Sequence, residues 1–310
     1  MEALKKILSD VIYNILSRLN FSKLFEIRMR NGQPITINYN NNYYFLGENG
    51  LVDDEKQALI SEKEDIEQVI INASNASLYT INDQIKQGFV SCQGGIRIGL
   101  VGQVVEENSQ ILTVKNFNAI NIRVPHEVVG CSKKILPYLF RNGDFLNTLI
   151  VSPPGAGKTT MLRDICYQLS LNNLALNILV IDERNEIASC YNGKNMLGIG
   201  KFADVITGGT KEYGFINGIR SMSPDIICTD ELGSENDFDS IDKAFTCGVK
   251  LLASVHASSV FELKEKSNFL ICMKKHIFKR YVVLSNKPVK GTIDAVYDDN
   301  LKLIYGGVEW

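Results

Sequence analysis

The segment SPPGAGKTT, residues 152–160, constrains the fold more than any other part of the sequence. A short apolar run, residues 147–151, comes directly before it, and a helical pattern of apolar residues follows it at Met161, Leu162, Ile165 and Leu169. A strand, a glycine-rich loop and a helix in this order are the setting of a phosphate-binding loop. The alternation of strands and helices after residue 145 predicts an α/β domain with a parallel sheet.

The loop has the residue types that bind the phosphates of a nucleotide. Backbone N–H groups from Gly155 to Lys158 would surround the phosphates at the positive end of the helix. Lys158 would contact the β- and γ-phosphate oxygens, and the hydroxyl of Thr159 would bind Mg²⁺. The full set of expected nucleotide-binding residues is Pro154, Gly155, Ala156, Gly157, Lys158, Thr159 and Thr160. Ser152 stands where the usual pattern has its first glycine, and a small serine is tolerable there because that position makes the turn out of the strand.

A hydrolytic site also needs a metal-binding acid and a base, and the segment SPDIICTDEL, residues 223–232, offers both. An apolar strand ends there in Asp230 and Glu231. Asp230 would hold the water shell of Mg²⁺, and Glu231 would orient and activate the attacking water. The alternative is an acidic strand end that faces solvent.

Two further strand ends carry polar residues. NILVIDERNE, residues 177–186, ends in Asp182 and Glu183, where open α/β sheets place ligand chemistry; a structural ion-pair network is the alternative. In KLLASVHASS, residues 250–259, an apolar strand ends at His256. ATPases with a phosphate-binding loop have a polar residue at this location that senses the γ-phosphate, although a lone histidine is more often a structural residue. We predict catalytic roles for Asp182, Glu183 and His256.

Length and composition indicate two domains and exclude several functions. The 310 residues are 45% apolar and 22% charged, which is ordinary for globular proteins. A net charge of −2 gives no global basic field for duplex DNA or an anionic membrane, so we expect no stable nucleic-acid partner. No apolar run approaches the ~18 residues of a transmembrane helix, and the seven scattered cysteines form no CxxC pair. We therefore expect a cytoplasmic protein without its own transmembrane segment.

The expected domain organisation follows from the change of pattern along the chain. Residues 1–130 combine short β-type runs with amphipathic helices, which predicts a smaller α+β domain. Residues 131–144 are expected to form a linker helix, and residues 145–310 the P-loop domain.

Several segments together resemble a known family. SPPGAGKTT, VIDERNEIA, IRSMSPDIICTDELG and LLASVHASS, with EIRMRNGQP, QGFVSCQGGIRIGLVG and FNAINIRVP in the first half, resemble the stage III sporulation protein AA family of endospore-forming bacteria. That family is similar to the hexameric ATPases of type II and type IV secretion and of pilus retraction. The resemblance implies a RecA-like fold. It matches Lys158 and Thr159 to Walker A, Asp230 and Glu231 to Walker B, His256 to the histidine box, and Asp182 and Glu183 to the aspartate box.

The resemblance also implies a working context. It suggests a Mg²⁺-dependent ATP hydrolase that forms a homohexameric ring in the mother cell. The ring would stand at the base of membrane-embedded sporulation channel proteins that link mother cell and forespore. A nucleotide at a subunit edge needs an arginine from a neighbour. Four arginines are candidates, namely Arg97, Arg123, Arg184 and Arg220, and we favour Arg97 or Arg123 because the first domain caps the nucleotide in the related secretion enzymes.

Two other functions remain open at this stage. One is a RecA-type motor stimulated by nucleic acid, with the first domain as its gripping surface. The other is a docking module that binds ATP but hydrolyses it slowly, which the departure at Ser152 keeps in view.

Overall fold

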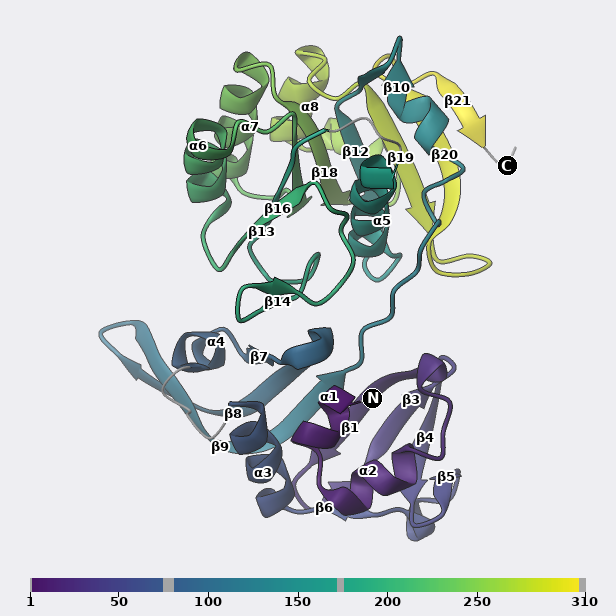
Figure 1. Cartoon of the computed structure of the whole chain (residues 1–310), viewed down its shortest axis with the longest axis vertical. Helices are drawn as coiled ribbons and strands as arrows, with labels where there is room; N and C mark the ends of the chain where they lie inside the picture. The colour runs from purple at the N-terminus through teal and green to yellow at the C-terminus, as the bar shows by residue number, and fades with distance from the viewer. Residues whose placement is uncertain (1, 75–80, 172–175, 307–310) are drawn as a thin grey trace. The chain divides into compact units, whose positions relative to one another are not determined.

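The structure, a computed structural model, describes residues 2–74, 81–171 and 176–306. The chain divides into two units (Figure 1). The first contains residues 1–126 together with Ser189–Met196, and the second contains Glu127–Ala188 together with residues 197–310. The sequence placed the boundary at residue 130 and gave no sign that Ser189–Met196 belongs to the first unit.

The first unit is built on a seven-stranded sheet of order β5-β4-β3-β1-β9-β8-β7, in which neighbouring strands are antiparallel. Its strands are β1 (Leu24–Arg30), β3 (Thr36–Tyr39), β4 (Asn42–Gly47), β5 (Gly50–Val52), β7 (Phe89–Ser91), β8 (Arg97–Glu107) and β9 (Gln110–Arg123). Small two-stranded pairs are formed by β2 (Gln33–Pro34) with β6 (Ile60–Ser61) and by β14 (Cys190–Tyr191) with β15 (Lys194–Asn195). Its α-helices, within the described residues, are α1 (Glu2–Ile7), α2 (Asp10–Leu16), α3 (Lys63–Ala73) and α4 (Asn82–Lys86).

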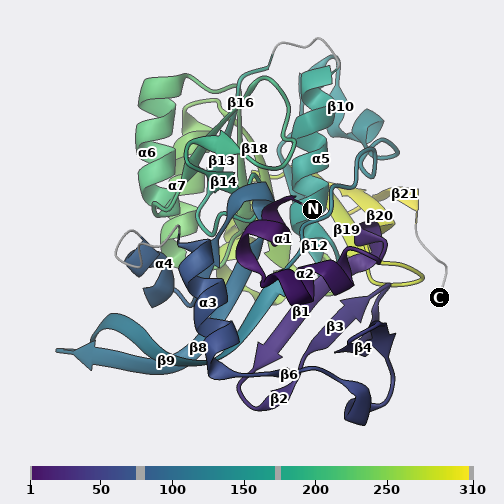
Figure 2. The same cartoon turned by 60° about the horizontal axis from the view of Figure 1, so that its bottom comes forward.

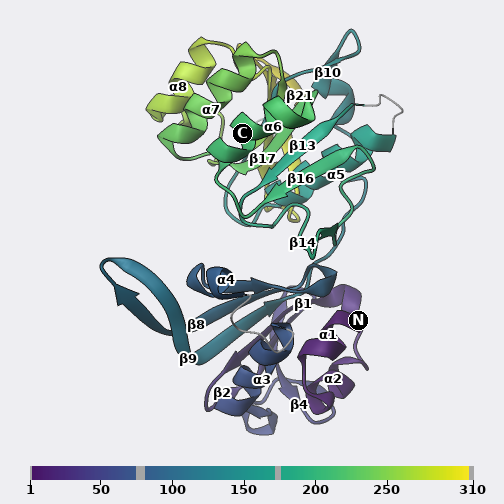
Figure 3. The same cartoon turned by 60° about the vertical axis from the view of Figure 1, so that its left-hand side comes forward.

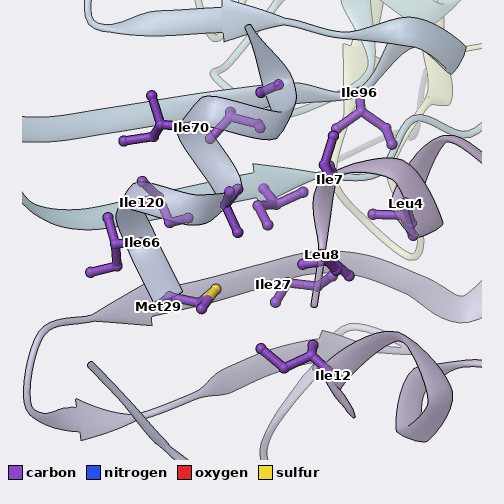
Figure 4. Close-up of a cluster of buried hydrophobic side chains, with 14 of the residues drawn as sticks. Leu4, Ile7, Leu8, Ile12, Ile27, Met29, Ile66, Ile70, Ile96 and Ile120 are labelled. Carbon is purple, nitrogen blue, oxygen red and sulfur yellow. The ribbon is translucent and has the colours of Figure 1, made fainter. Parts of the chain in front are cut away.

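Helices α1, α2 and α3 lie across one face of this sheet (Figure 2). Their apolar side chains pack against those of the strands in one core, part of which Figure 4 shows. Apolar residues at helical spacing over residues 3–20 form a stripe that predicts one amphipathic helix. The chain forms two helices there, because Ser9 adopts an extended backbone and caps α2 through a hydrogen bond from Ile12 N to its hydroxyl at 3.5 Å. The stripe nevertheless packs inside its own unit, as shown by the burial of Leu4, Ile7 and Ile15.

The second unit is built on an eight-stranded sheet of order β16-β13-β17-β18-β12-β19-β20-β21. Its first six strands are parallel to their neighbours and β20 and β21 are antiparallel. The strands are β12 (Thr148–Ser152), β13 (Ile178–Asp182), β16 (Ala203–Thr207), β17 (Ile226–Glu231), β18 (Lys250–His256), β19 (Arg280–Ser285), β20 (Thr292–Asp298) and β21 (Leu303–Gly306). The α-helices in the described part are α5 (Lys158–Leu171), α6 (Lys211–Met222), α7 (Glu235–Thr246) and α8 (Ser267–Lys274).

The helices cover both faces of this sheet. Alternate residues of the strands, such as Leu149 and Val151 of β12, pack with Phe215 of α6 and Ile241 of α7 in one core. Helix α5 covers the opposite face, with α6, α7 and α8 on the other side (Figure 3). Because both faces are covered, every residue of β12 and of β13 is buried.

The strand order brings the predicted site residues to one edge. Strand β18 lies between β12 and β17, and β13 lies next to β17. Ser152 pairs with His256 across β12 and β18, and Glu231 pairs with Ser254 across β17 and β18. The carboxyl ends of parallel strands meet at the same edge of a sheet, which is where such folds bind ligands.

The predicted linker helix at residues 131–144 is absent from the structure. This segment forms turns, then a short 3₁₀ helix (Leu136–Leu139) and a hairpin of β10 (Phe140–Arg141) with β11 (Asp144–Phe145). Pro137 cannot donate a hydrogen bond within an α-helix. In addition, the carboxylate of Asp164 on α5 accepts hydrogen bonds from the backbone N–H groups of Gly130 and Ser132. The start of the segment is therefore fixed to α5.

None of the helices in the described residues is long and apolar enough to cross a membrane.

Candidate nucleotide-binding site

The phosphate-binding loop connects β12 to α5 through two glycines with left-handed backbone. Gly155 has φ +72° and Gly157 has φ +88°, conformations that L side chains rarely adopt. Gly157 also lies close to the neighbouring backbone, since a Cβ there would stand 3.4 Å from Cα of Gly291. Helix α5 begins at Lys158, so the N–H groups of its first turn face the loop.

Ser152 fits the end of the strand without a glycine. Its φ is not among the positive values found in the described residues, and its side chain is fully buried. The hydroxyl donates a hydrogen bond to the carbonyl of Pro153 at 3.0 Å. The departure from the usual loop pattern therefore puts no left-handed strain on the chain.

Lys158, His256 and Glu231 form a connected chain at the strand ends. The Nζ of Lys158 lies 2.7 Å from Nδ1 of His256, and Nε2 of His256 lies 3.2 Å from Oε2 of Glu231. Lys158 is only 8% exposed. Burial lowers the pKa of Lys158 below its ordinary value, while the charges of Glu231 and Glu186 oppose the shift. The structure thus brings together three residues that the sequence placed in the site separately.

Asp230 lies beside this chain in a buried position. Burial raises the pKa of its carboxyl to about 7; the charge of Lys211 opposes the shift, and nearby acidic groups add to it. Its Oδ1 is buried and accepts no hydrogen bond from the described residues, although Nζ of Lys211 lies 3.7 Å away. A carboxylate oxygen without a hydrogen-bond donor fits a divalent cation or a water of its shell, so Asp230 suits the Mg²⁺ role that the sequence assigns to it.

Asp182 and Glu183 have different surroundings, although they are adjacent in the sequence. Asp182 is fully buried and accepts hydrogen bonds from the backbone N–H groups of Glu186, Ile187 and Ala188 at 2.7 to 3.1 Å. Burial raises its pKa, and these hydrogen bonds oppose the shift. Both oxygens of Asp182 therefore hold the turn that follows β13. Glu183 instead accepts a hydrogen bond from Nζ of Lys211 at 2.9 Å.

The candidate arginines lie in two places. Arg97 and Arg123 belong to the first unit, where β8 and β9 place them directly opposite each other, and the guanidinium of Arg97 lies 3.7 Å from the ring centroid of Phe89. Arg184 belongs to the second unit, with Nη1 3.9 Å from Oε2 of Glu231. Arg220 lies in the last turn of α6.

Two residues at the site were missed by sequence reasoning. Lys211, the first residue of α6, pairs with Glu183 and Asp230; the available signal was its place after Gly208-Gly209-Thr210, a helix start at a strand end. Arg163 on α5 donates hydrogen bonds to the carbonyls of Glu186 and Ile187, and its helical position alone gave no signal.

Two cavities open at this edge of the sheet. One of about 360 Å³ is lined by Glu183, Lys211, Glu231 and Asp237, among others. The other, of about 330 Å³, is lined by Glu231, His256 and the apolar side chains of Phe238 and Phe269, among others. Glu231 contributes to both, so it lies between them.

Comparisons with known proteins identify the family of the chain. The sequence profile of the family "Sporulation stage III, protein AA" matches residues 1–304. The chain belongs to this family. It is 32% identical over 304 residues to stage III sporulation protein AA of Bacillus subtilis (strain 168), covering 96% of this chain and 95% of that protein.

Solved structures confirm the fold. The ATPase DotB of Legionella pneumophila is similar with a TM-score of 0.57 at 12% identity, covering 90% of this chain and 77% of DotB. The pilus retraction motor PilT, solved with bound ADP, is similar with a TM-score of 0.53 at 12% identity, covering 88% of this chain and 76% of PilT. The family member therefore has the RecA-like fold of DotB and PilT, preceded by an N-terminal domain built on a β-sheet, as the sequence predicted.

Proposed function

We propose that this family member is a Mg²⁺-dependent ATP hydrolase that works as a ring motor during sporulation. One observation carries the proposal. The phosphate-binding loop, the buried Lys158, Asp230 with its buried Oδ1, and the His256–Glu231 pair meet at the carboxyl edge of one sheet. The family relationship to a sporulation protein and the likeness to motor ATPases support the same function.

The residues divide into binding and hydrolytic roles. The glycine-rich loop and Lys158 would bind the phosphates, with the side chains of Thr159 and Asp230 directed to the metal. Mg²⁺, when bound, would neutralise charge on the phosphate oxygens. Glu231 would orient the attacking water and accept its proton, while His256, 3.2 Å away, would keep the carboxylate in place and sense the γ-phosphate.

In the proposed ring, arginines of a neighbouring copy would supply further positive charge to the bound nucleotide. Arg97 and Arg123 lie opposite each other on adjacent strands, so one patch of the first unit presents two guanidinium groups. We propose that this pair reaches the nucleotide of a neighbouring copy in a homohexamer, and that Arg184, beside Glu231, acts within its own chain.

We further propose where the motor works. It would lie in the mother-cell cytoplasm, at the base of membrane-embedded channel proteins between mother cell and forespore. The γ-phosphate would hold the protein in one conformation and its release would allow another, so hydrolysis would drive motion against the channel.

The test is the ATPase activity of the purified protein as a function of its own concentration. A shared active site predicts that the activity per chain rises steeply as the ring assembles, and that EDTA removes the activity. Binding of ATP without hydrolysis at any concentration would instead support a docking module. A several-fold stimulation by single-stranded DNA would support a nucleic-acid motor.

A further inference from the structure

Lys211 is a buried lysine at the nucleotide site to which sequence reasoning gave no role. It is 8% exposed, and its Nζ lies 2.9 Å from Oε2 of Glu183 and 3.7 Å from Oδ1 of Asp230. An ammonium this close to two carboxylates places a positive charge inside an acidic edge of the sheet.

The position of Lys211 is fixed by the packing of its helix. The hydroxyl of Thr210 caps α6 by accepting a hydrogen bond from the N–H of Tyr213 at 3.2 Å. One turn along, Gly214 lets the helix approach β13 so closely that a Cβ there would stand 2.7 Å from Cγ2 of Ile181. These contacts fix the backbone of α6 at Lys211, next to the ends of β13 and β17.

Lys211 interacts with the carboxylates of Glu183 and Asp230 in different ways. Glu183 accepts its hydrogen bond, whereas Oδ1 of Asp230 is near the ammonium but accepts no hydrogen bond from the described residues. Asp230 is 6% exposed, so water compensates little of its charge. Asp230 thus lies near the positive charge of Lys211, while its Oδ1 could still bind a cation.

We propose that Lys211 is an internal counter-ion that competes with the divalent cation for Asp230, so that the metal enters this site only together with a nucleotide. The inference rests on the proposed function, in which Asp230 belongs to the Mg²⁺ site. A metal that approaches Asp230 meets repulsion from the ammonium. The phosphates of ATP supply negative charge and oxygen ligands that offset this repulsion. Glu183 keeps the hydrogen bond of Lys211 throughout, and its role is to hold the lysine.

The experiment measures metal binding without nucleotide and without turnover. Free Mn²⁺ is followed by electron paramagnetic resonance while the full-length protein is titrated in the absence of ATP. Lys211→Met removes the charge and keeps the length of the side chain, and Lys211→Gln removes the charge but keeps a donor for Glu183. Both should bind Mn²⁺ at least about tenfold more tightly than the wild type. Lys211→Arg should bind Mn²⁺ like the wild type.

Two controls make the result specific. Lys243→Met removes an exposed positive charge on α7 and should leave Mn²⁺ affinity unchanged. Adding Asp230→Asn to Lys211→Met should abolish the gain in affinity. The proposal is overturned if folded Lys211→Met and Lys211→Gln bind Mn²⁺ no more tightly than the wild type, or if the gain survives Asp230→Asn. Wild-type ATP binding is measured in the same series, and its absence would contradict the proposed function separately.

Discussion

Nζ of Lys158 lies 2.7 Å from Nδ1 of His256. The same Nζ lies 3.3 Å from Nε2 of the ring, and Nε2 lies 3.2 Å from Oε2 of Glu231. Lysine, histidine and glutamate thus form one contact network. A phosphate that binds Lys158 would draw the ammonium away from His256, so nucleotide binding would reach Glu231 through one imidazole ring.

Lys158→Ala should abolish measurable ATP binding. The ammonium is the buried cation of the phosphate-binding loop, and hydrogen bonds to charged groups contribute about 1.5–3 kcal/mol each. Titration with a fluorescent ATP analogue measures the loss. Lys243→Ala, an exposed lysine of the same unit, is the matched control and should bind like the wild type. Retained affinity in Lys158→Ala would remove the phosphate-binding role of this loop.

Glu231→Gln should keep ATP binding and stop hydrolysis. The amide preserves the size of the side chain and an oxygen that can face His256, but it cannot accept a proton from water. General-base catalysis contributes about 10²–10⁴-fold to the rate, so phosphate release should fall by that factor while the dissociation constant of ATP stays the same. Unchanged phosphate release in this variant would mean that another group activates the water.

Arg97→Ala or Arg123→Ala should lower turnover if the pair acts on a neighbouring nucleotide. Arginine fingers contribute about 10³–10⁵-fold to the rate, and the loss should appear at protein concentrations where the ring has assembled. ATP affinity of the single chain should change little. Arg18→Ala, an exposed arginine of the same unit, serves as the control. Full turnover in both variants would leave Arg184 and Arg220 as the candidates.

The sequence predicted the parts of the site that motifs carry and missed those that strand order creates. Lys158, Glu231 and His256 each follow an apolar strand, so their common location at one edge follows from a parallel sheet. Lys211 could not be found this way, because its partners depend on β13 lying next to β17 and on how deeply α6 packs.

The first unit shows the same limit. Its strands after residue 24 follow from alternation and turn residues. In contrast, the interruption of the N-terminal helix at Ser9 depends on a local cap, and the placement of Ser189–Met196 in the first unit depends on contacts far apart in sequence. One such contact is the hydrogen bond from Gly94 N to Sδ of Met196 at 3.3 Å.

Gly214→Ala should destabilise the protein, although alanine has a higher helix propensity than glycine. Alanine in a helix interior is favoured over glycine by about 1 kcal/mol, but its Cβ would stand 2.7 Å from Cγ2 of Ile181, and overpacking of this kind typically costs about 1–3 kcal/mol. Urea unfolding measures the difference. The double variant with Ile181→Ala makes room for the methyl group, so the two changes should couple favourably by at least about 0.5 kcal/mol. Additive effects would show that α6 does not depend on this contact.

Asp164→Asn should destabilise the protein in a way that depends on pH. The carboxylate of Asp164 is 3% exposed and accepts hydrogen bonds from Gly130 N and from both N and Oγ of Ser132 at 2.6 to 2.7 Å. Burial alone would raise its pKa, but these hydrogen bonds outweigh burial and lower the pKa below its ordinary value. The ionised form therefore stabilises the folded chain above the unfolded pKa of about 3.9, and this contribution is lost as the pH falls through the folded value.

The stability gap between wild type and Asp164→Asn should accordingly be about 1.5–3 kcal/mol at pH 7. It should shrink as the pH falls below about 4, because the wild-type carboxyl then becomes protonated. Urea unfolding at both pH values measures the two gaps. Ser132→Ala removes one donor and keeps the carboxylate, so it should be destabilised at pH 7 but retain acid-dependent loss of stability. An equal gap for Asp164→Asn at pH 7 and pH 3 would show that the charge of Asp164 does not hold residues 130–132 to α5.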